Sequence, residues 1–225
     1  MYGRFVKRTL DILLSFFALL VLSPVLLVLT LLGWIMMKGN PFYTQLRPGY
    51  HEKIFKMIKF RSMTEDRDEE GNYLPDEARL TKYGHFIRAT SLDELPEFLN
   101  ILKGDMSLVG PRPLLVRDMV FMTPEQRKRH SVRPGLTGLA QCSGRNALLW
   151  ENKLQLDMVY IREITFMKDL RIVLKTAKIV ISGGDGGSDE TEVTDDYGDY
   201  LLSAGRVTAE EYKKKQQEAK ELLNV

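Results

Sequence analysis

The chain has 225 residues, which is enough for one domain of ordinary size plus an appendage. Its single cysteine, Cys142, excludes an intramolecular disulfide and a cysteine-based zinc site, and is typical of a protein in a reducing compartment. The formal net charge of +2 and the lack of a recognition motif argue against a nucleic-acid-binding protein.

The charge is distributed unevenly along the chain. Up to Arg61, nine Lys/Arg residues stand against two acidic ones, so the rest of the chain carries −5 within the total of +2. A cationic N-terminal quarter predicts a local anionic partner, such as a membrane surface or phosphate groups.

An uncharged apolar segment occupies residues 12–37. As one straight helix it would be ~39 Å long, more than the ~30 Å of a bilayer core, which favours a transmembrane helix. Ser23-Pro24 interrupts it near the middle, because Pro24 has no N–H for the Leu20 carbonyl and its ring clashes with that turn. Each half would reach only about the bilayer midplane.

Both flanks of this segment are cationic, whereas the positive-inside rule normally gives one cationic flank. The flanking bases are Arg4, Lys7 and Arg8 before the segment and Lys38, Arg47, Lys53 and Lys56 after it. This pattern supports a helix that enters, bends at Ser23-Pro24 and leaves by the same face as strongly as it supports a spanning helix, provided that Ser23 or a water satisfies the freed carbonyl. A kinked spanning helix remains the alternative. A cleaved signal peptide is disfavoured, because no A-x-A-like site follows.

The next segments predict a β-hairpin and a helix. Residues 42–45 and 53–61 have strand character on either side of a Pro-Gly turn, and alternation places Lys59 on the face of Phe55 and Met57. An edge lysine that keeps its ammonium in solvent is the simplest interpretation of Lys59. Residues 79–88 are expected to be helical and to lead into the central stretch.

The central stretch, residues 91–113, begins with adjacent acids. Ser91-x-x-Glu94 matches a capping box, which would give Glu94 and Asp93 a purely structural role at a helix start. Pro96 conflicts with that register, so the helix starts later or is distorted. The apolar stripe Leu95, Phe98, Leu99 and Leu102 is predicted to face the core.

The stretch ends with Arg112 between Pro111 and Pro113, which restricts the backbone of the arginine and suits it to a phosphate fork. A carboxylate pair followed by a rigidly presented guanidinium suits the handling of a phosphate with a divalent cation. The glycine-rich turns 133–138 and 143–146 are further, weaker hypotheses for phosphate loops, since no P-loop pattern is present.

The C-terminal part is less informative. A helical stripe in residues 170–181 predicts either a core helix or a surface amphipathic helix, and the second is favoured beside a membrane anchor. An acidic stretch, residues 185–199, is predicted to be a solvated linker. A helix is expected at about 208–223.

Several motifs occur together and in order within about residues 1–180. They are Lys7-Arg8-x-x-Asp11, Ser23-Pro24, KFRSM at 59–63, SLDELP at 91–96, KGDMSLVGPRP at 103–113, RPGLTG at 133–138 and GRN at 144–146. In these residues the chain resembles the bacterial monotopic phosphoglycosyl transferases, the small bacterial sugar transferase family. The combination of the acid pair with GPRP is the most specific feature, and the minimal members without extra N-terminal spans are the most similar in length.

The resemblance implies an α+β, mainly helical fold. It implies a re-entrant membrane helix-break-helix in residues 1–38, a small globular cytoplasmic catalytic domain with a β-hairpin in 39–182, and surface amphipathic helices. Residues 183–225, an acidic linker and a helix, lie outside the shared core. The expected location is the cytoplasmic face of the bacterial inner membrane, with both ends of the re-entrant helix cytoplasmic and the phospholipid bilayer as a partner.

The resemblance also implies transfer of a sugar-1-phosphate from a UDP-sugar to undecaprenyl phosphate with release of UMP, the first membrane step of glycoconjugate biosynthesis. Asp93 would attack the β-phosphate and carry a covalent phosphosugar, and Glu94 would assist. Both acids would hold Mg²⁺, or Mn²⁺ in its place. Substrate phosphates would meet Lys59, Arg88, Pro111, Arg112 and Arg145. Downstream glycosyltransferases are further expected partners, and nucleic acid is not.

Two other functions remain open from the residues. Asp93 and Glu94 could serve only as metal ligands for direct attack by the lipid phosphate, without a covalent intermediate. Alternatively, the chain could be a membrane-anchored assembly module without catalysis, with its acids as caps and its arginines on lipid headgroups.

Overall fold

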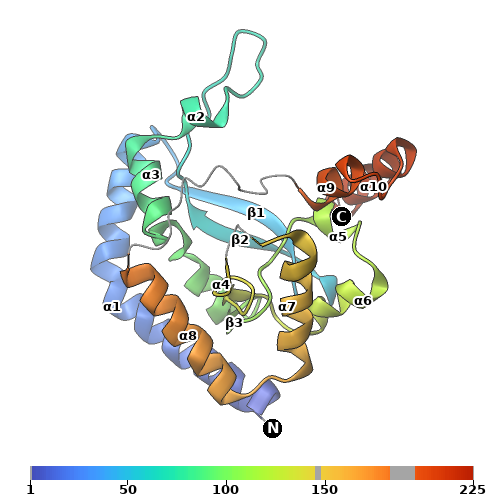
Figure 1. Ribbon diagram of the computed structural model, residues 1–225. Helices are drawn as coiled ribbons and strands as arrows, with labels where there is room; N and C mark the ends of the chain where they lie inside the picture. The colour runs from blue at the N-terminus through green and yellow to red at the C-terminus, as the bar shows by residue number, and fades with distance from the viewer. Residues whose placement is uncertain (1, 145–147, 183–195, 225) are drawn as a thin grey trace.

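The computed structural model describes residues 2–144, 148–182 and 196–224. The structure is mainly helical, and its helices surround a β-hairpin (Figure 1). The helices are α1 (Lys7–Met36), α2 (Asp76–Arg79), α3 (Lys82–Ala89), α4 (Glu97–Lys103), α5 (Val116–Met119), α6 (Pro124–Arg127), α7 (Trp150–Arg162), α8 (Phe166–Ile181), α9 (Tyr197–Ser203) and α10 (Ala209–Leu223). The strands of the described residues are β1 (Phe42–Pro48), β2 (Ile54–Phe60), β3 (Ser107–Val109) and β4 (Gly135–Thr137).

The predicted hairpin is confirmed. β1 and β2 pair antiparallel with Tyr43 opposite Lys59, and the Gly49 N–H donates to the Lys53 carbonyl at 2.9 Å where the strands reverse. Phe55 and Met57 are buried on the face that the alternation predicted, where they pack with Ile101 of α4. The hairpin therefore supplies a fixed strand, β2, for the helices that follow.

α1 is one continuous helix across Pro24, and it is long enough and apolar enough to cross a membrane. The predicted break is therefore a feature within one helix and does not divide two helices. The Ser23 hydroxyl donates to the Leu20 carbonyl at 2.8 Å, which is the carbonyl that Pro24 leaves without an N–H partner. Ser23 thus satisfies the freed carbonyl, which is the condition under which such a break is tolerated in lipid. Figure 1 shows α1 following a bent path along one side of the molecule.

Both ends of α1 dock on the same globular domain. Near the start, Arg8 donates to the carbonyls of Ile101 and Leu102 at 2.6 and 2.9 Å, at the end of α4. Near the other end, the Tyr83 hydroxyl of α3 donates to the Leu29 carbonyl at 3.0 Å, and Gly33 packs closely against Pro41. Most of the side chains between these contacts are exposed and apolar.

α8 is the surface amphipathic alternative of the two that its sequence allowed. Its buried residues are Asp169 and Ile172, while the predicted apolar stripe is exposed, with Leu174 60% and Ile181 85% accessible. The start of α8 contacts the start of α1, because Lys7 forms an ion pair with Asp169 at 2.5 Å.

The C-terminal part packs on the domain and is not merely appended to it. α9 and α10 cover α5 and the start of α7, and they lie together at one end of the molecule (Figure 1). Their shared core comprises Val116, Met119, Val120, Phe121, Met122, Trp150, Leu154, Tyr197, Leu201 and Ala219. Residues 183–195 of the predicted linker lie outside the described residues. Its last part is wrong as a solvated linker, because Asp196 pairs with Arg117 at 2.5 Å and α9 begins at Tyr197.

Candidate active site

A side-chain amide fixes the distance between β2 and α4. Asn100, fully buried in α4, accepts a hydrogen bond from the Ile58 N–H at 3.0 Å and donates to the Lys56 carbonyl at 2.7 Å. The amide thus takes the place of a neighbouring strand on the backbone of β2. This contact places Lys59, the next residue of β2, beside the segment that precedes α4.

The segment that carries Asp93 and Glu94 is a turn and not the first turn of a helix. Ser91 has a left-handed backbone with φ of +56° and makes no capping hydrogen bond. Residues 92–94 form a single 3₁₀ turn, and α4 begins only at Glu97, with Pro96 as its N-cap residue. The capping-box interpretation is therefore wrong, and the later helix start suggested by Pro96 is confirmed.

Glu94 is the hub of the site. Its Oε1 accepts from Lys59 Nζ at 2.7 Å and from Arg112 Nη2 at 3.0 Å. Burial alone would raise the pKa of Glu94, but Arg112 and Lys59 together lower it to about 2. Glu94 is therefore ionised and binds two cations, one from β2 and one from the GPRP segment. The Lys59 of the structure is a buried-site cation and not a solvated edge lysine.

Asp93 lies next to this hub but is left without a direct partner. Its carboxylate makes no hydrogen bond or ion pair with the part of the chain that the structure describes. Burial raises the pKa of Asp93 and Glu94 raises it further, whereas Lys59, Arg88 and Arg112 oppose this rise. Asp93 is thus a carboxylate whose oxygens are available and whose charge depends on the surrounding cations.

Arg88 reaches this region from α3. Its Nε donates to the Ser62 hydroxyl at 2.8 Å, just beyond the end of β2, while the rest of the side chain is exposed. α3 lies close to this segment, since a Cβ on Gly84 would stand 1.8 Å from the Ser62 carbonyl oxygen. The Arg88 charge is also near enough to Asp93 to act on that carboxylate, since it lowers the pKa of Asp93.

A third acid of the site, Glu97 in the first turn of α4, was not predicted from the sequence. Its side chain is 4% exposed, and Oε1 lies 3.2 Å from Lys59 Nζ. Burial raises the pKa of Glu97 to about 7, against the attraction of Lys59. Its spacing of three residues from Glu94 could have indicated a shared helix face. The core face was predicted instead from the apolar stripe, which does not include Glu97.

The glycine-rich turn at 133–138 packs directly against Gly110 of the GPRP segment, which carries Arg112. β3 and β4 pair in parallel, with Val109 opposite Thr137, directly before the GPRP segment. A Cβ on Gly135 would stand 2.1 Å from the Gly110 nitrogen, and one on Gly138 would stand 2.2 Å from the Gly110 carbonyl oxygen. Only glycine fits this approach. The turn at 133–138, considered as a phosphate loop, is thus the strand partner of GPRP.

The remaining predicted residues are placed as follows. Pro111 is buried, and its carbonyl accepts the Gly135 N–H at 2.9 Å. Ser23 and Pro24 belong to α1 and not to this cluster. Arg145 lies outside the described residues. The structure therefore brings together Lys59, Asp93, Glu94 and Arg112, with Arg88 beside them.

The acids fit a cation that is held mostly by its substrate. Among the described residues there is no group of three or more His, Cys, Asp or Glu side chains arranged to hold a metal ion. Mg²⁺ is commonly bound by one or two carboxylates together with substrate phosphates. The free oxygens of Asp93, next to Glu94, provide that kind of ligand set.

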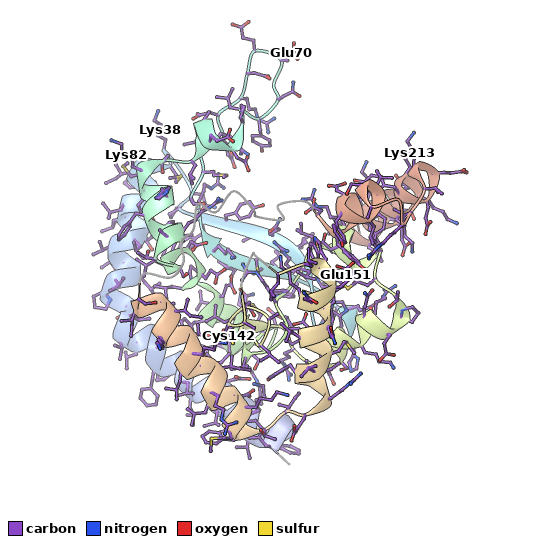
Figure 2. The ribbon with its side chains drawn as sticks, in the orientation of Figure 1. Lys38, Glu70, Lys82, Cys142, Glu151 and Lys213 are labelled. Atoms are coloured by element: carbon purple, nitrogen blue, oxygen red, sulfur yellow. The ribbon has the colours of Figure 1, made fainter. Side chains whose placement is uncertain are left out.

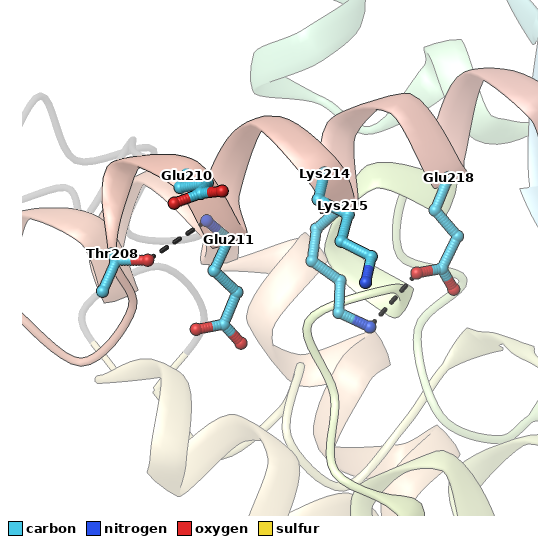
Figure 3. A pocket seen from close by; sticks show the side chains of 6 residues that line it. All are labelled: Thr208, Glu210, Glu211, Lys214, Lys215 and Glu218. Atoms are coloured by element: carbon cyan, nitrogen blue, oxygen red, sulfur yellow. Dashed lines mark hydrogen bonds and ion pairs between the residues drawn. The ribbon is translucent and has the colours of Figure 1, made fainter.

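Other surface features are weaker candidates. Figure 2 shows Glu70 at the tip of a projecting loop and Lys213 on α10, both pointing into solvent, and Cys142, which is buried in the interior. A depression of about 560 Å³ on α10 is lined by charges of both signs, among them an ion pair between Lys215 and Glu218 at 3.2 Å (Figure 3). Its charges are already partly paired with one another.

Comparison with known proteins identifies the family. A family model described as "Bacterial sugar transferase" matches residues 2–183, which is most of the chain. The match ends before α9 and α10, so the C-terminal helices lie outside the shared part.

Named relatives agree with this match. The chain is 48% identical over 180 residues to an uncharacterized sugar transferase, EpsL, of Bacillus subtilis, which covers 79% of this chain and 89% of that protein. It is 38% identical over 199 residues to an undecaprenyl-phosphate galactose phosphotransferase of Salmonella typhimurium, covering 80% of this chain and 41% of the other. A UDP-glucose:undecaprenyl-phosphate glucose-1-phosphate transferase of Klebsiella pneumoniae is 39% identical over 180 residues, covering 76% and 39%.

The chain thus spans most of EpsL but only about two fifths of the larger relatives. The matched part contains α1, the hairpin, the acidic turn and the GPRP segment, which are the elements that build the site. The chain belongs to the bacterial sugar transferase family.

Proposed function

We propose that this protein transfers a sugar-1-phosphate from a UDP-sugar to undecaprenyl phosphate and releases UMP. The observation that carries the proposal is that Asp93, a carboxylate without a bonded partner among the described residues, lies next to a cluster of cations around Glu94. Nucleophile and phosphate-binding groups are thereby side by side. Two relatives are named as transferases that act on undecaprenyl phosphate, one with galactose and one with glucose-1-phosphate.

The transfer proceeds in two displacements at phosphorus. In the first, an oxygen of Asp93 forms a bond to the β-phosphorus of the donor, and the bond from that phosphorus to the UMP oxygen breaks. UMP leaves with the electron pair. In the second, an oxygen of undecaprenyl phosphate attacks the same phosphorus, and the Asp93 carboxylate leaves to give the lipid diphosphate sugar. Two highly charged substrates are thus never required to react with each other directly.

The cations keep the nucleophile ready. Burial raises the pKa of Asp93, so its ionised form depends on Lys59, Arg88 and Arg112, which lower it. Glu94 holds Lys59 and Arg112 in place until a donor phosphate meets them. Asp93 and Glu94 would also hold Mg²⁺, which supplies positive charge to the reacting phosphates when bound.

The docking of α1 supports a location on one face of the bilayer. A straight helix from Arg8 to Leu29 is about 32 Å long, roughly the thickness of the bilayer core, so a spanning helix would carry its two docking sites to opposite faces. The globular domain contacts both sites at once. A re-entrant α1 with both ends on the cytoplasmic face of the inner membrane is consistent with these contacts and brings Asp93 to the level of a lipid phosphate.

The test is an intact-mass measurement without lipid acceptor. Detergent-solubilised protein is mixed with Mg²⁺ and, separately, UDP-glucose, UDP-galactose and their N-acetylated analogues. A mass gain of one phosphosugar with stoichiometric UMP is expected for one or more donors, and none is expected for Asp93→Asn. The matched control Asp76→Asn, at an exposed acid of α2, should form the adduct like the parent.

Other results would change the proposal in distinct ways. Turnover only after undecaprenyl phosphate is added, with no adduct, would favour direct attack with Asp93 and Glu94 as metal ligands. No UMP from any donor, with or without lipid, would overturn the transferase and favour the non-catalytic assembly module.

A further inference from the structure

The main chain of the GPRP segment is held at every residue. The Gly110 N–H donates to the Thr137 carbonyl at 2.9 Å, and the carbonyls of Pro111, Arg112 and Pro113 accept from Gly135 N at 2.9 Å, Arg129 Nη2 at 2.6 Å and Arg47 Nη1 at 3.1 Å. The two prolines lack an N–H and fix their own φ. The side chain of Arg112, by contrast, is 48% exposed and points to Glu94.

Arg129 is the more deeply buried of the two arginine donors. Its side chain is 2% exposed, and that of Asp157, its partner on α7, is 5% exposed. Arg129 donates to Asp157 Oδ2 from Nε at 3.0 Å and from Nη2 at 2.7 Å. The same Nη2 reaches the Arg112 carbonyl, so one guanidinium connects α7 to the residue that meets the acid pair.

A contribution to folding stability does not account for the Arg129–Asp157 ion pair. Burial raises the pKa of Asp157, and the attraction of Arg129 only opposes that rise. Buried ion pairs are often no more stabilising than apolar side chains of similar size. Arg127, two residues earlier, forms an ion pair with Glu52 at 2.6 Å in a half-exposed position and does not bond to the GPRP segment.

We propose that Arg129, oriented by Asp157, is a positioning residue for the transfer reaction, because it fixes the main chain of Arg112 and thereby the place where its guanidinium meets the donor phosphates. The proposal rests on the proposed function of Arg112. It extends that function to a buried pair, outside the acidic turn, that touches neither substrate nor Asp93.

The experiment is a double-mutant cycle on the full-length chain in detergent with Mg²⁺, undecaprenyl phosphate and the UDP-sugar that gives UMP in the panel above. The pair is replaced by apolar residues, Arg129→Met with Asp157→Leu, so that no buried charge is left unpaired. We expect kcat/KM to fall roughly 10- to 100-fold while the melting temperature stays within a few degrees. In an Arg112→Ala background the same replacement should change kcat/KM less than about twofold. Arg127→Met is the matched control and should keep the parent rate.

Three results would overturn the proposal. One is an equal loss in both backgrounds, which would mean that the pair acts through something other than Arg112. Another is a loss no greater than that of Arg127→Met. The third is a parent-like rate for Arg112→Ala alone, which would remove the role proposed for Arg112 and is visible without any change at Arg129.

A second variant guards against failure to fold. Arg129→Lys keeps a positive charge beside Asp157 but has a single nitrogen in place of the guanidinium fork. It should lower kcat/KM with an intact Arg112 and leave it unchanged in Arg112→Ala. If Arg129→Lys is as active as the parent with Arg112 present, Arg129 does not position Arg112.

Discussion

Neighbouring acids in this protein differ in pKa because their partners differ. Glu94 receives two cations, which lower its pKa to about 2 although burial opposes this. Glu97 is buried beside the same lysine, Lys59. The attraction of Lys59 does not offset the effect of burial, which raises the pKa of Glu97 to about 7. Asp93 has no hydrogen-bond or ion-pair partner among the described residues, and its pKa is raised by burial and by Glu94. Environments that separate the pKa values of adjacent carboxylates are typical of sites in which one acid reacts and another orients.

The same reasoning gives a pH dependence away from the acids. His130 is 6% exposed, and burial, with Arg129 beside it, lowers its pKa to about 4 although Glu52 attracts the proton. The unfolded chain takes up a proton at His130 as the pH falls through about 6.5, whereas the folded protein does so only near pH 4. Between these values the unfolded state binds more protons, so stability is lost as the pH falls.

We therefore expect the free energy of unfolding to decrease from pH 7 to pH 4.5, with His130 contributing about 2–3 kcal/mol at most. His130→Leu should flatten this dependence in urea denaturation measured in detergent. His85→Leu, at an exposed histidine of α3, should leave it as in the parent. An unchanged slope in His130→Leu would show that other groups cause the acid sensitivity.

At the scale of elements, the local patterns were predictable and the long-range ones were not. The β-hairpin follows from alternation and a Pro-Gly turn, which are contained in a few adjacent residues. The buried face of α4 was predicted only in part, because Leu95 and Phe98 of the apolar stripe pack against the core, but the most deeply buried positions are others. The apolar stripe includes Leu99, which is 41% exposed, whereas Glu97 and Asn100 are buried. Their partners, Lys59 and the backbone of β2, are about 40 residues away in the sequence and leave no periodic signal near α4.

The candidate site shows the same division. The resemblance indicated Asp93, Glu94, Lys59 and Arg112, and the structure brings these four together. It did not indicate Arg129, because that residue acts on a backbone carbonyl and sits in a run of cations that has the composition of a solvated helix end. Nor does composition predict that β4 would pair in parallel with β3, since such pairing depends on a distant segment.

The contact of Asn100 with β2 gives a prediction for α4. Asn100→Ala leaves the Lys56 carbonyl and the Ile58 N–H without their partner in a buried place. We expect a loss of about 2–4 kcal/mol in the free energy of unfolding, together with a lower kcat, because Lys59 and Glu94 are no longer held at a fixed separation. Leu99→Ala, on the exposed side of the same helix, should cost less than about 1 kcal/mol. Equal effects of the two substitutions would contradict the role of Asn100 in holding β2 against α4.

At the scale of the whole molecule, α1 determines where the site can work. The charged residues at the start of α1 bond to the globular domain. Lys7 pairs with Asp169, Arg8 caps the end of α4, and Asp11 accepts the Leu108 N–H at 3.0 Å. These contacts join α1 to the two segments that carry the site, because α4 directly follows the acidic turn and Leu108 directly precedes the GPRP segment. A change in the path of α1 would therefore reach the acidic turn and the GPRP segment as well as the topology.

This coupling makes the topology testable at both ends of α1. The variants are Phe5→Cys and Lys38→Cys, each in a Cys142→Ser background. Both positions are exposed in the structure. Position 5 is chosen over position 2 because the Tyr2 hydroxyl bonds to Asp169. A membrane-impermeant maleimide added to intact spheroplasts should label neither position in the re-entrant parent, and both should react after permeabilisation.

Pro24→Ala should shift this result. The new N–H can bond to the Leu20 carbonyl, the ring no longer clashes with the preceding turn, and a straighter α1 of 30 residues is long enough to span. We expect position 5 to become labelled from outside, position 38 to remain protected, and transferase activity to fall, because Arg8 and Asp11 can no longer dock on the domain. Ser23→Ala, which removes only the hydroxyl bond to Leu20, should keep most of the parent topology. Labelling of position 5 in the parent would rule out the re-entrant path, and no labelling in Pro24→Ala would mean that the docking contacts, and not the proline, hold α1 on one face.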